Sequence, residues 1–237
     1  MPGSVLKAGA RRLIFDNSPK LLLISLLYVV FSTVVSWLSI RLPGNINLQD
    51  IYDRLSSGEI PNLKIIYTNF KPIGVFLAIL LSLLLPVLDI GFFSYCMKIN
   101  RYKETEYRDL FNGFFYIIKV ISLFIITAVF ILFWSLLLIV PGIVASYRYR
   151  LAYYILLDDP GKSVLQCISE SKILMHGKKV DLLIIDLSFW GWYLLDFATV
   201  LLTPLPFVIP IVSIWLSPYV VLTRIAFYEN QITNIAV

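Results

Sequence analysis

The segment Trp134–Pro160 reads WSLLLIVPGIVASYRYRLAYYILLDDP, and the topology of the whole chain depends on how it is placed. An apolar helix is predicted to end at Pro141, and a tyrosine-rich apolar stretch that carries Arg148 and Arg150 follows. Residues 143–157 form a poor span on hydropathy alone, because a bilayer crossing needs about 20 mostly apolar residues. The sequence on either side therefore has to decide whether this stretch crosses.

The next segment has the pattern of a surface helix, predicted over residues 160–176. Asp158 and Asp159 before Pro160 supply a capping side chain and a proline at the first turn, and Gly177 ends the helix. Its basic residues suit a negatively charged inner leaflet; they are Lys162, Lys172, Lys178 and Lys179. The positive-inside rule keeps these lysines in the cytosol only if residues 143–157 cross, so the sequence favours a crossing.

Composition places the chain in a bilayer. Hydrophobic residues make up 59% of the 237 residues and charged residues 15%, and the mean hydropathy is +0.82. This leaves too little polar side chain to cover a water-soluble globule of this length. The net charge of +5 comes from basic residues that flank apolar runs, which argues against nucleic-acid binding. Two cysteines, Cys96 and Cys167, do not make a disulfide framework.

The predicted fold is all-α, a polytopic membrane helical bundle that forms one integral domain over residues 1–237. About six transmembrane helices are expected, near residues 20–40, 72–97, 113–140, 143–157, 180–202 and 207–228. A basic helix over 3–16 is expected to lie at the interface, with a solvated tail as the alternative. Pro86, Asp89 and Gly91 predict a kink in the second span. Residues 41–71 are either a connecting loop or contain a short amphipathic turn, and both termini are expected in the cytosol.

Charged residues within the predicted spans are the candidate functional residues. An unpaired charge at the bilayer centre costs about 3 kcal/mol or more, so partners or water are expected. The candidate polar network consists of Asp89, Arg148, Arg150, Asp186, Asp196 and Arg224. Structural ion pairs are the main interpretation, and a polar pathway or a headgroup site is the alternative. Asp186 and Asp196 lie about 15 Å apart along one helix and on roughly similar faces, so they could pair with different arginines.

Basic residues at the predicted inner ends are candidate contacts to anionic lipid; they are Lys7, Arg11, Arg12, Lys172, Lys178 and Lys179. The tyrosines around Arg148, and Trp190 with Trp192, are typical of an interfacial belt. An aromatic cage for a cation is the weaker alternative.

Motifs for catalysis are missing from the sequence. The single histidine, His176, leaves little basis for a histidine metal site or a Ser-His relay. There is no G-x-S-x-G, H-E-x-x-H, P-loop or G-x-G-x-x-G. The adjacent Asp158 and Asp159 are interpreted as a helix cap and not as a metal-binding pair. We therefore expect no enzyme activity and assign no catalytic, cofactor-binding or metal-binding residue.

Several stretches together resemble a known family. They are LFWSLLLIVPGIVASYRYRLAYYILLDDP, SKILMHGKK, LSFWGWYLL and SPYVVLTRIAFYE, with DLFNGF at Asp109–Phe114 and LKAGARRL near the N-terminus. They are similar, over nearly the whole chain, to an uncharacterised bacterial family of small integral membrane proteins, domain-of-unknown-function family 975. That family looks related to the membrane domain of some glycerophosphodiester phosphodiesterases, without the catalytic barrel. The resemblance implies a bacterial plasma-membrane location and no known reaction, and the chain departs from it at Arg150 and in its long first loop.

Two functions remain open. The first is a non-catalytic, multi-pass plasma-membrane protein that binds anionic inner-leaflet lipid, a partner membrane protein or a second copy of itself. The alternative is a small transporter with a polar intramembrane route, in which asparagine at Asp89 or Asp186 would abolish solute flux. An intramembrane enzyme acting on lipid headgroups would lack a nucleophile, a base or a metal cluster.

Overall fold

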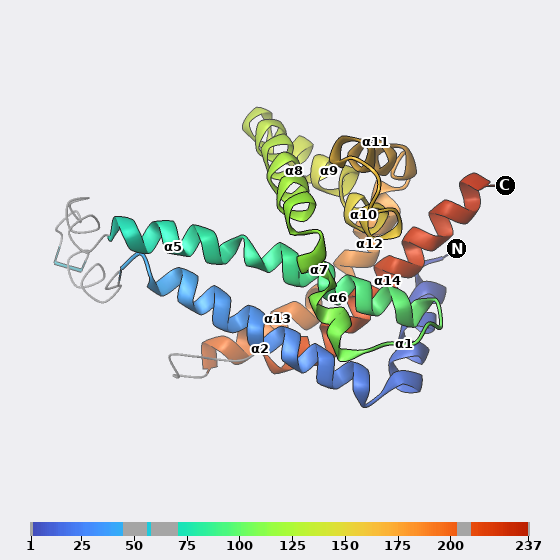
Figure 1. The fold of residues 1–237 in the computed structure, drawn as a ribbon, viewed down its shortest axis with the longest axis horizontal. Helices are drawn as coiled ribbons and strands as arrows, with labels where there is room; N and C mark the ends of the chain where they lie inside the picture. The colour runs from blue at the N-terminus through green and yellow to red at the C-terminus, as the bar shows by residue number, and fades with distance from the viewer. Residues whose placement is uncertain (1, 45–55, 58–70, 203–209, 237) are drawn as a thin grey trace. The chain divides into compact units, whose positions relative to one another are not determined.

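The computed structural model describes residues 2–44, 56–57, 71–202 and 210–236 (Figure 1). All regular secondary structure in these ranges is helical, which confirms the all-α prediction. The chain divides into two compact units, Phe31–Leu85 on the one hand and Met1–Val30 with Pro86–Val237 on the other. Among the described residues, five helical segments are long and apolar enough to cross a membrane; they are Lys20–Arg41, Pro72–Asn100, Ile117–Leu137, Lys179–Thr199 and Ile211–Asn234.

The smaller unit, Phe31–Leu85, contains the second half of α2 (Lys20–Arg41) and α5 (Pro72–Ser82). The two helix ends meet closely, because a Cβ added at Gly74 would lie 1.9 Å from the carbonyl oxygen of Leu42. The amphipathic turn considered within residues 41–71 lies almost entirely outside the described residues.

The helix predicted over residues 72–97 is interrupted, as its proline indicates. α5 ends at Ser82, and α6 (Leu84–Asn100) begins after a break at Leu83. Pro86 lacks an amide hydrogen, and its ring clashes with the carbonyl of the residue four positions earlier, which is Ser82. The helix is therefore interrupted beside Pro86, where the sequence predicted a kink, and proline explains the position of the break.

Gly91 has a different role from the one its place near the kink indicated. A Cβ on Gly91 would lie 1.7 Å from the carbonyl oxygen of Leu110, and a Cβ on Gly113 would lie 2.0 Å from that of Val87. These contacts join α6 to η1 (Tyr107–Phe111) and α7 (Asn112–Phe115). Glycine permits this backbone-to-backbone approach, as small residues commonly do between membrane helices.

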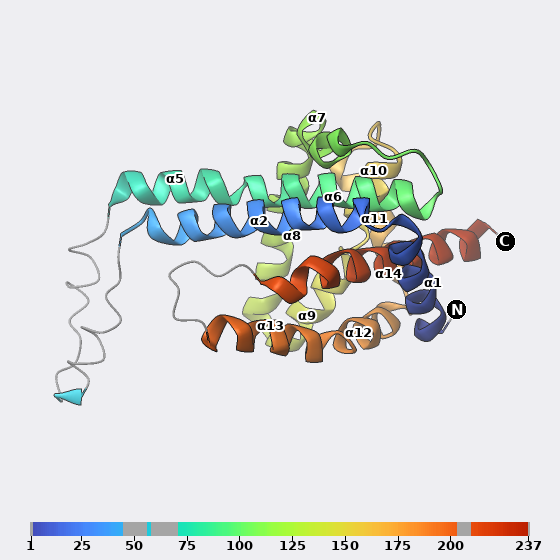
Figure 2. The same cartoon turned by 90° about the horizontal axis from the view of Figure 1, so that it is seen from below.

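The segment that follows the predicted break near Pro141 forms a hairpin with the helix before it. α8 (Ile117–Leu137) ends where Leu138 becomes extended, and α9 (Ile139–Arg148) packs back against α8. The break therefore precedes Pro141, which lies in the first turn of α9, where a proline removes no helical hydrogen bond. Figure 2 shows the pair running crosswise to α6 and α14.

After α9, the chain continues back to the start of α8. α10 (Ala152–Asp158) continues from α9, and Lys119, near the start of α8, donates hydrogen bonds to the carbonyls of Pro160 and Lys162. Residues 139–158 thus run back along the length of α8. They form a longer return segment than the predicted 143–157, although α9 and α10 are each too short to count among the five candidate spans.

The surface helix is shorter than predicted, and its cap was assigned wrongly. α11 (Val164–Leu174) begins at Ser163, whose hydroxyl accepts the Gln166 amide hydrogen, while the Gln166 side chain accepts that of Ser163. This reciprocal capping box satisfies two free amides at once. Asp158 instead ends α10, and Asp159 accepts a hydrogen bond from the Gly161 amide at 3.0 Å. Gly177, with φ of +72°, follows the helix as predicted.

The last spans pair with each other and carry the N-terminal helix. α12 (Lys179–Leu187) and α13 (Trp190–Leu202) are separated by a break, and α13 packs against α14 (Ile211–Ala236). α1 (Gly3–Asn17) packs across α14, which covers much of its apolar face with protein.

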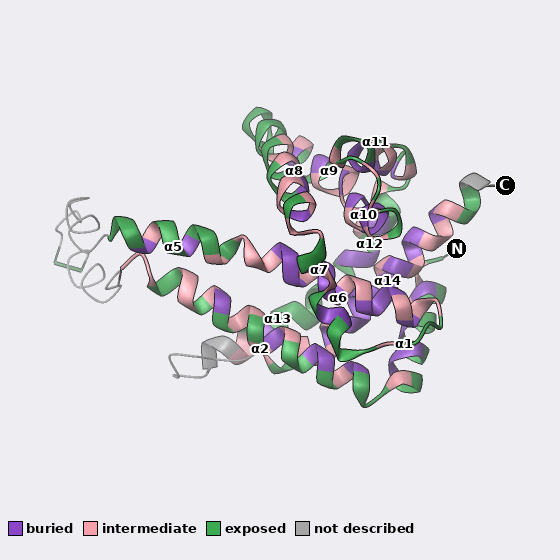
Figure 3. Ribbon diagram, in the orientation of Figure 1, coloured by how far each residue is buried: buried purple, intermediate pink, exposed green. Residues whose placement is uncertain are grey.

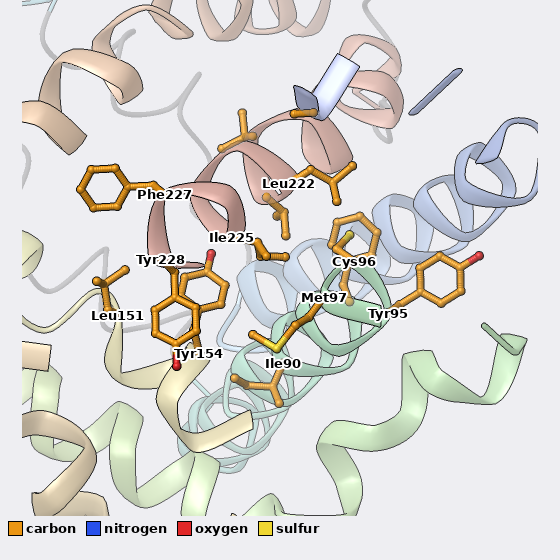
Figure 4. Close-up of a cluster of buried hydrophobic side chains, with 14 of the residues drawn as sticks. Ile90, Tyr95, Cys96, Met97, Leu151, Tyr154, Leu222, Ile225, Phe227 and Tyr228 are labelled. Atoms are coloured by element: carbon orange, nitrogen blue, oxygen red, sulfur yellow. The ribbon is translucent and has the colours of Figure 1, made fainter. Parts of the chain in front are cut away.

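The core of the larger unit lies where α6, α10 and α14 meet (Figure 4). The Tyr154 and Tyr228 rings stack with centroids 5.6 Å apart, beside Ile225 and Met97. By contrast, the tip of the α8–α9 hairpin is apolar and exposed, with Leu136 and Ile139 each 78% exposed (Figure 3). Such a surface fits hydrocarbon better than water.

Candidate functional site

Asp186 is the centre of the polar network that the structure forms. Its Oδ1 accepts a hydrogen bond from Nε of Arg224 at 3.0 Å, and its Oδ2 accepts one from the Tyr147 hydroxyl at 3.1 Å. The terminal nitrogen Nη2 of Arg150 lies 3.6 Å from the same Oδ2. One carboxylate therefore links α12, α14, α9 and the turn after α9. We call these four residues, Tyr147, Arg150, Asp186 and Arg224, the Asp186 cluster.

The Asp186 cluster lies where two helices are interrupted. α9 ends at Arg148 and α10 starts at Ala152, so Arg150 occupies the turn between them. α12 ends at Leu187, one residue after Asp186, and α13 starts at Trp190. Non-helical backbone at membrane depth is tolerated where protein or water satisfies it, and discontinuous helices commonly line binding sites in membrane proteins.

Burial differs across the Asp186 cluster. The Asp186 and Arg224 side chains are 10% and 16% exposed, while the Arg150 side chain is 34% exposed and lies over the Tyr147 ring at 5.6 Å. Asp186 and Arg224 thus form the buried pair, and Arg150 forms the open edge of the cluster.

The other predicted network members lie apart from this cluster. Asp89 accepts a hydrogen bond from the Tyr28 hydroxyl at 2.7 Å, and Asp196 accepts one from the Ser213 hydroxyl. The Arg148 side chain forms no hydrogen bond or ion pair with any residue that the structure describes, although its backbone carbonyl accepts one from Ser171. Asp196 also has no arginine partner in those ranges. The two aspartates of this span therefore do not pair with different arginines in the described ranges, because Arg150 and Arg224 both pair with Asp186.

The predicted lipid-contact residues have varied surroundings. Lys7 donates to the Ser188 hydroxyl and lies over the Phe189 ring, and Arg11 lies over Tyr219. Lys172 lies over Phe130 and Tyr149. Arg12 lies 3.6 Å from the carboxylate of Asp16, four residues later, and Lys178 lies 3.6 Å from that of Asp181, three residues later. Lys179 is the first residue of α12.

A second ionic cluster was not foreseen from the sequence. Arg101 binds Asp158 through Nη1 at 2.6 Å and Glu229 through Nε at 2.7 Å, and the Tyr228 hydroxyl donates to Asp158 at 2.6 Å. The hydrogen bond to Asp158, followed by that to Glu229, raises the pKa of Arg101. The only sequence signal was opposite charge at helix ends that were predicted to lie on one side. This cluster joins the ends of α6 and α10 to the C-terminal part of α14.

The Asp109 carboxylate stabilises the loop after α6. Burial alone raises the pKa of Asp109, but its bond from Lys98 Nζ at 2.6 Å and the bond from the Glu106 amide at 2.9 Å bring the pKa below its ordinary value. Asp109 thus stays charged and orders the turn that places Gly113 against α6.

Comparison with known proteins gives a family likeness over part of the chain. A family model described as a protein of unknown function (DUF975) matches residues 136–235, which include the whole Asp186 cluster. No curated protein and no solved structure matches the chain. The further resemblance to the membrane domain of glycerophosphodiester phosphodiesterases has no support in these comparisons.

Proposed function

We propose that this chain is a non-catalytic, multi-pass plasma-membrane protein whose basic inner surface binds acidic lipid headgroups. The observation that supports it most is a set of cations on α1, on α11 and at the start of α12, defined here as the inner basic surface: Lys7, Arg11, Arg12, Lys172, Lys178 and Lys179. The carboxylates beside this surface are exposed, since Asp16 and Asp181 are each 56% exposed. Exposed ion pairs are worth little, so these lysines and arginines keep their affinity for anionic headgroups.

Lipid retention tests this proposal. The purified protein should retain phosphatidylglycerol in preference to phosphatidylcholine, as measured by native mass spectrometry. K172Q/K178Q/K179Q should lose most of this preference, and high salt should mimic the loss in the unaltered protein, because exposed charges are screened. The matched control is R54Q/K64Q/K71Q, which removes the same charge from residues 41–71, the segment that the predicted topology with cytosolic termini places outside, and it should keep the preference. Equal retention of the two lipids by the unaltered protein would refute the proposal.

Transport is the second candidate, and one observation favours it. Asp196 is 7% exposed, and its Oδ1 is the single buried side-chain nitrogen or oxygen without a hydrogen-bond partner among the described residues. Such a carboxylate in an apolar helix is suited to accept a proton or a cation. However, Asp89, Asp186 and Asp196 have separate hydrogen-bond partners and form no continuous network in the described ranges. Transport would require D89N or D186N to abolish solute flux in reconstituted vesicles, whereas lipid binding would not.

A further inference from the structure

The Asp186 cluster holds more positive charge than its own carboxylate can neutralise. Arg150 and Arg224 both approach Asp186, at 3.6 and 3.0 Å, and no other acidic side chain pairs with either arginine in the part of the chain that is described. With all three groups ionised the cluster has a net charge of +1. An excess cation in apolar surroundings is costly, so the site favours an anion as a further partner.

The two guanidinium groups also have hydrogen-bond donors to spare. Each guanidinium carries five N–H donors. Within the described ranges Arg224 donates one hydrogen bond, through Nε, and Arg150 donates none. The Arg150 side chain is 34% exposed, so its terminal nitrogens are accessible to a ligand, whereas the Arg224 side chain is 16% exposed and more enclosed. Donors that are both free and accessible point to a ligand with several acceptor oxygens.

The backbone brings these donors to one place. Arg150 lies in the α9–α10 turn, and Asp186 lies at the end of α12, so both helix interruptions contribute to the same cluster. Arg150 lies in the turn before α10, whose seven residues rise about 10 Å to Asp158. A headgroup that enters from the side of the inner basic surface can reach Arg150 over this distance.

We propose that the Asp186 cluster is a binding site for a single phosphate group, held by Arg150 and Arg224 while Asp186 fixes the orientation of both. Arginine suits phosphate because its planar fork donates two parallel hydrogen bonds to two oxygens. The phosphate belongs either to an acidic phospholipid or to a soluble phosphate-bearing compound. The lipid case deepens the proposed function, since it adds one defined site to the diffuse attraction of the inner basic surface.

Salt separates the two kinds of lipid binding. Exposed lysines lose bound lipid as ionic strength rises, whereas a partly buried phosphate with several hydrogen bonds is screened much less. The experiment measures phosphatidylglycerol retained at high salt by native mass spectrometry, and the melting temperature of delipidated protein with inorganic phosphate. R150Q is the test variant. R148Q is the matched control, because it removes the same charge two residues earlier from a side chain with no partner among the described residues.

R150Q should retain about tenfold less phosphatidylglycerol at high salt, the effect of losing a charged hydrogen-bond donor, while R148Q should match the unaltered protein. A second outcome also supports the site. No lipid is then retained at high salt, but inorganic phosphate raises the melting temperature of the unaltered protein and of R148Q and does not raise that of R150Q. The Asp186 cluster would then bind a soluble phosphate compound and not a lipid headgroup. R150K keeps the charge beside Asp186, so it should fold even if R150Q does not, and should bind more weakly than the unaltered protein.

Equal binding by R150Q, R150K and the unaltered protein in both assays would overturn the phosphate site. That result would leave the proposed function intact if K172Q/K178Q/K179Q still lost its salt-sensitive lipid. Conversely, if the unaltered protein shows no salt-sensitive preference for phosphatidylglycerol, the proposed function is refuted. The lipid that R150Q and the unaltered protein retain at high salt would still show whether the phosphate site exists.

Discussion

Asp186→Asn should lower the free energy of unfolding by about 3 kcal/mol, the low end of the range for breaking a buried ion pair. The substitution removes the charge that offsets Arg150 and Arg224, and it leaves Arg224, which is only 16% exposed, as a largely enclosed cation without a counter-charge. The loss should appear as a lower melting temperature and a smaller yield of folded protein in detergent.

The control is Asp89→Asn. Asp89 accepts its hydrogen bond from the Tyr28 hydroxyl, and no cation pairs with it in the described ranges, so an asparagine oxygen can replace it. D89N should cost about 1 kcal/mol or less. Equal melting temperatures for D186N and the unaltered protein would show that Asp186 does not hold these helices together.

Gly91→Ala should also be strongly destabilising, at about 1–3 kcal/mol. Its Cβ would lie 1.7 Å from the carbonyl oxygen of Leu110, so the backbones of α6 and η1 would have to separate. Thermal unfolding in detergent measures the effect.

Gly191→Ala is the matched control for this change. Gly191 is also helical, and a Cβ there would have no neighbour within 4 Å in the described structure. Alanine should leave stability unchanged or raise it slightly, because it has the higher helix propensity. If G91A and G191A unfold at the same temperature, the close approach of α6 to η1 does not occur.

The course of the chain could be predicted because apolar length and charge bias are local properties of the sequence. The helices near residues 20–40, 113–140 and 207–228, the helix break before Pro86 and the helix ahead of Gly177 all follow from patterns that a few residues contain. Boundaries were less certain where two local signals competed. At Ser163 the capping box prevailed over the aspartates before Pro160, because it satisfies two amides instead of one.

The polar contacts could be predicted only in part. Asp186, Arg150 and Arg224 were recognised because charge in an apolar span needs a partner. Which partner each one takes depends on how separate helices pack, so the sharing of Asp186 by two arginines could not be read from the sequence. The Arg101 cluster was missed for the same reason, since Arg101 and Glu229 lie 128 positions apart. Gly91 was assigned to a kink because the neighbouring backbone of Leu110 is invisible in the sequence.

We propose that residues 139–158 return across the membrane along α8 and so bring α11 to the side on which α1 lies. Three exposed serines allow a direct test by cysteine labelling: Ser4 in α1, Ser169 in α11, and Ser56 in the long first loop. The native Cys96 and Cys167 are buried, so the unaltered chain should give little background. With a membrane-impermeant maleimide applied to sealed vesicles of either orientation, S4C and S169C should be labelled from one side and S56C from the other. Labelling of S169C together with S56C, from the side opposite S4C, would contradict the return crossing.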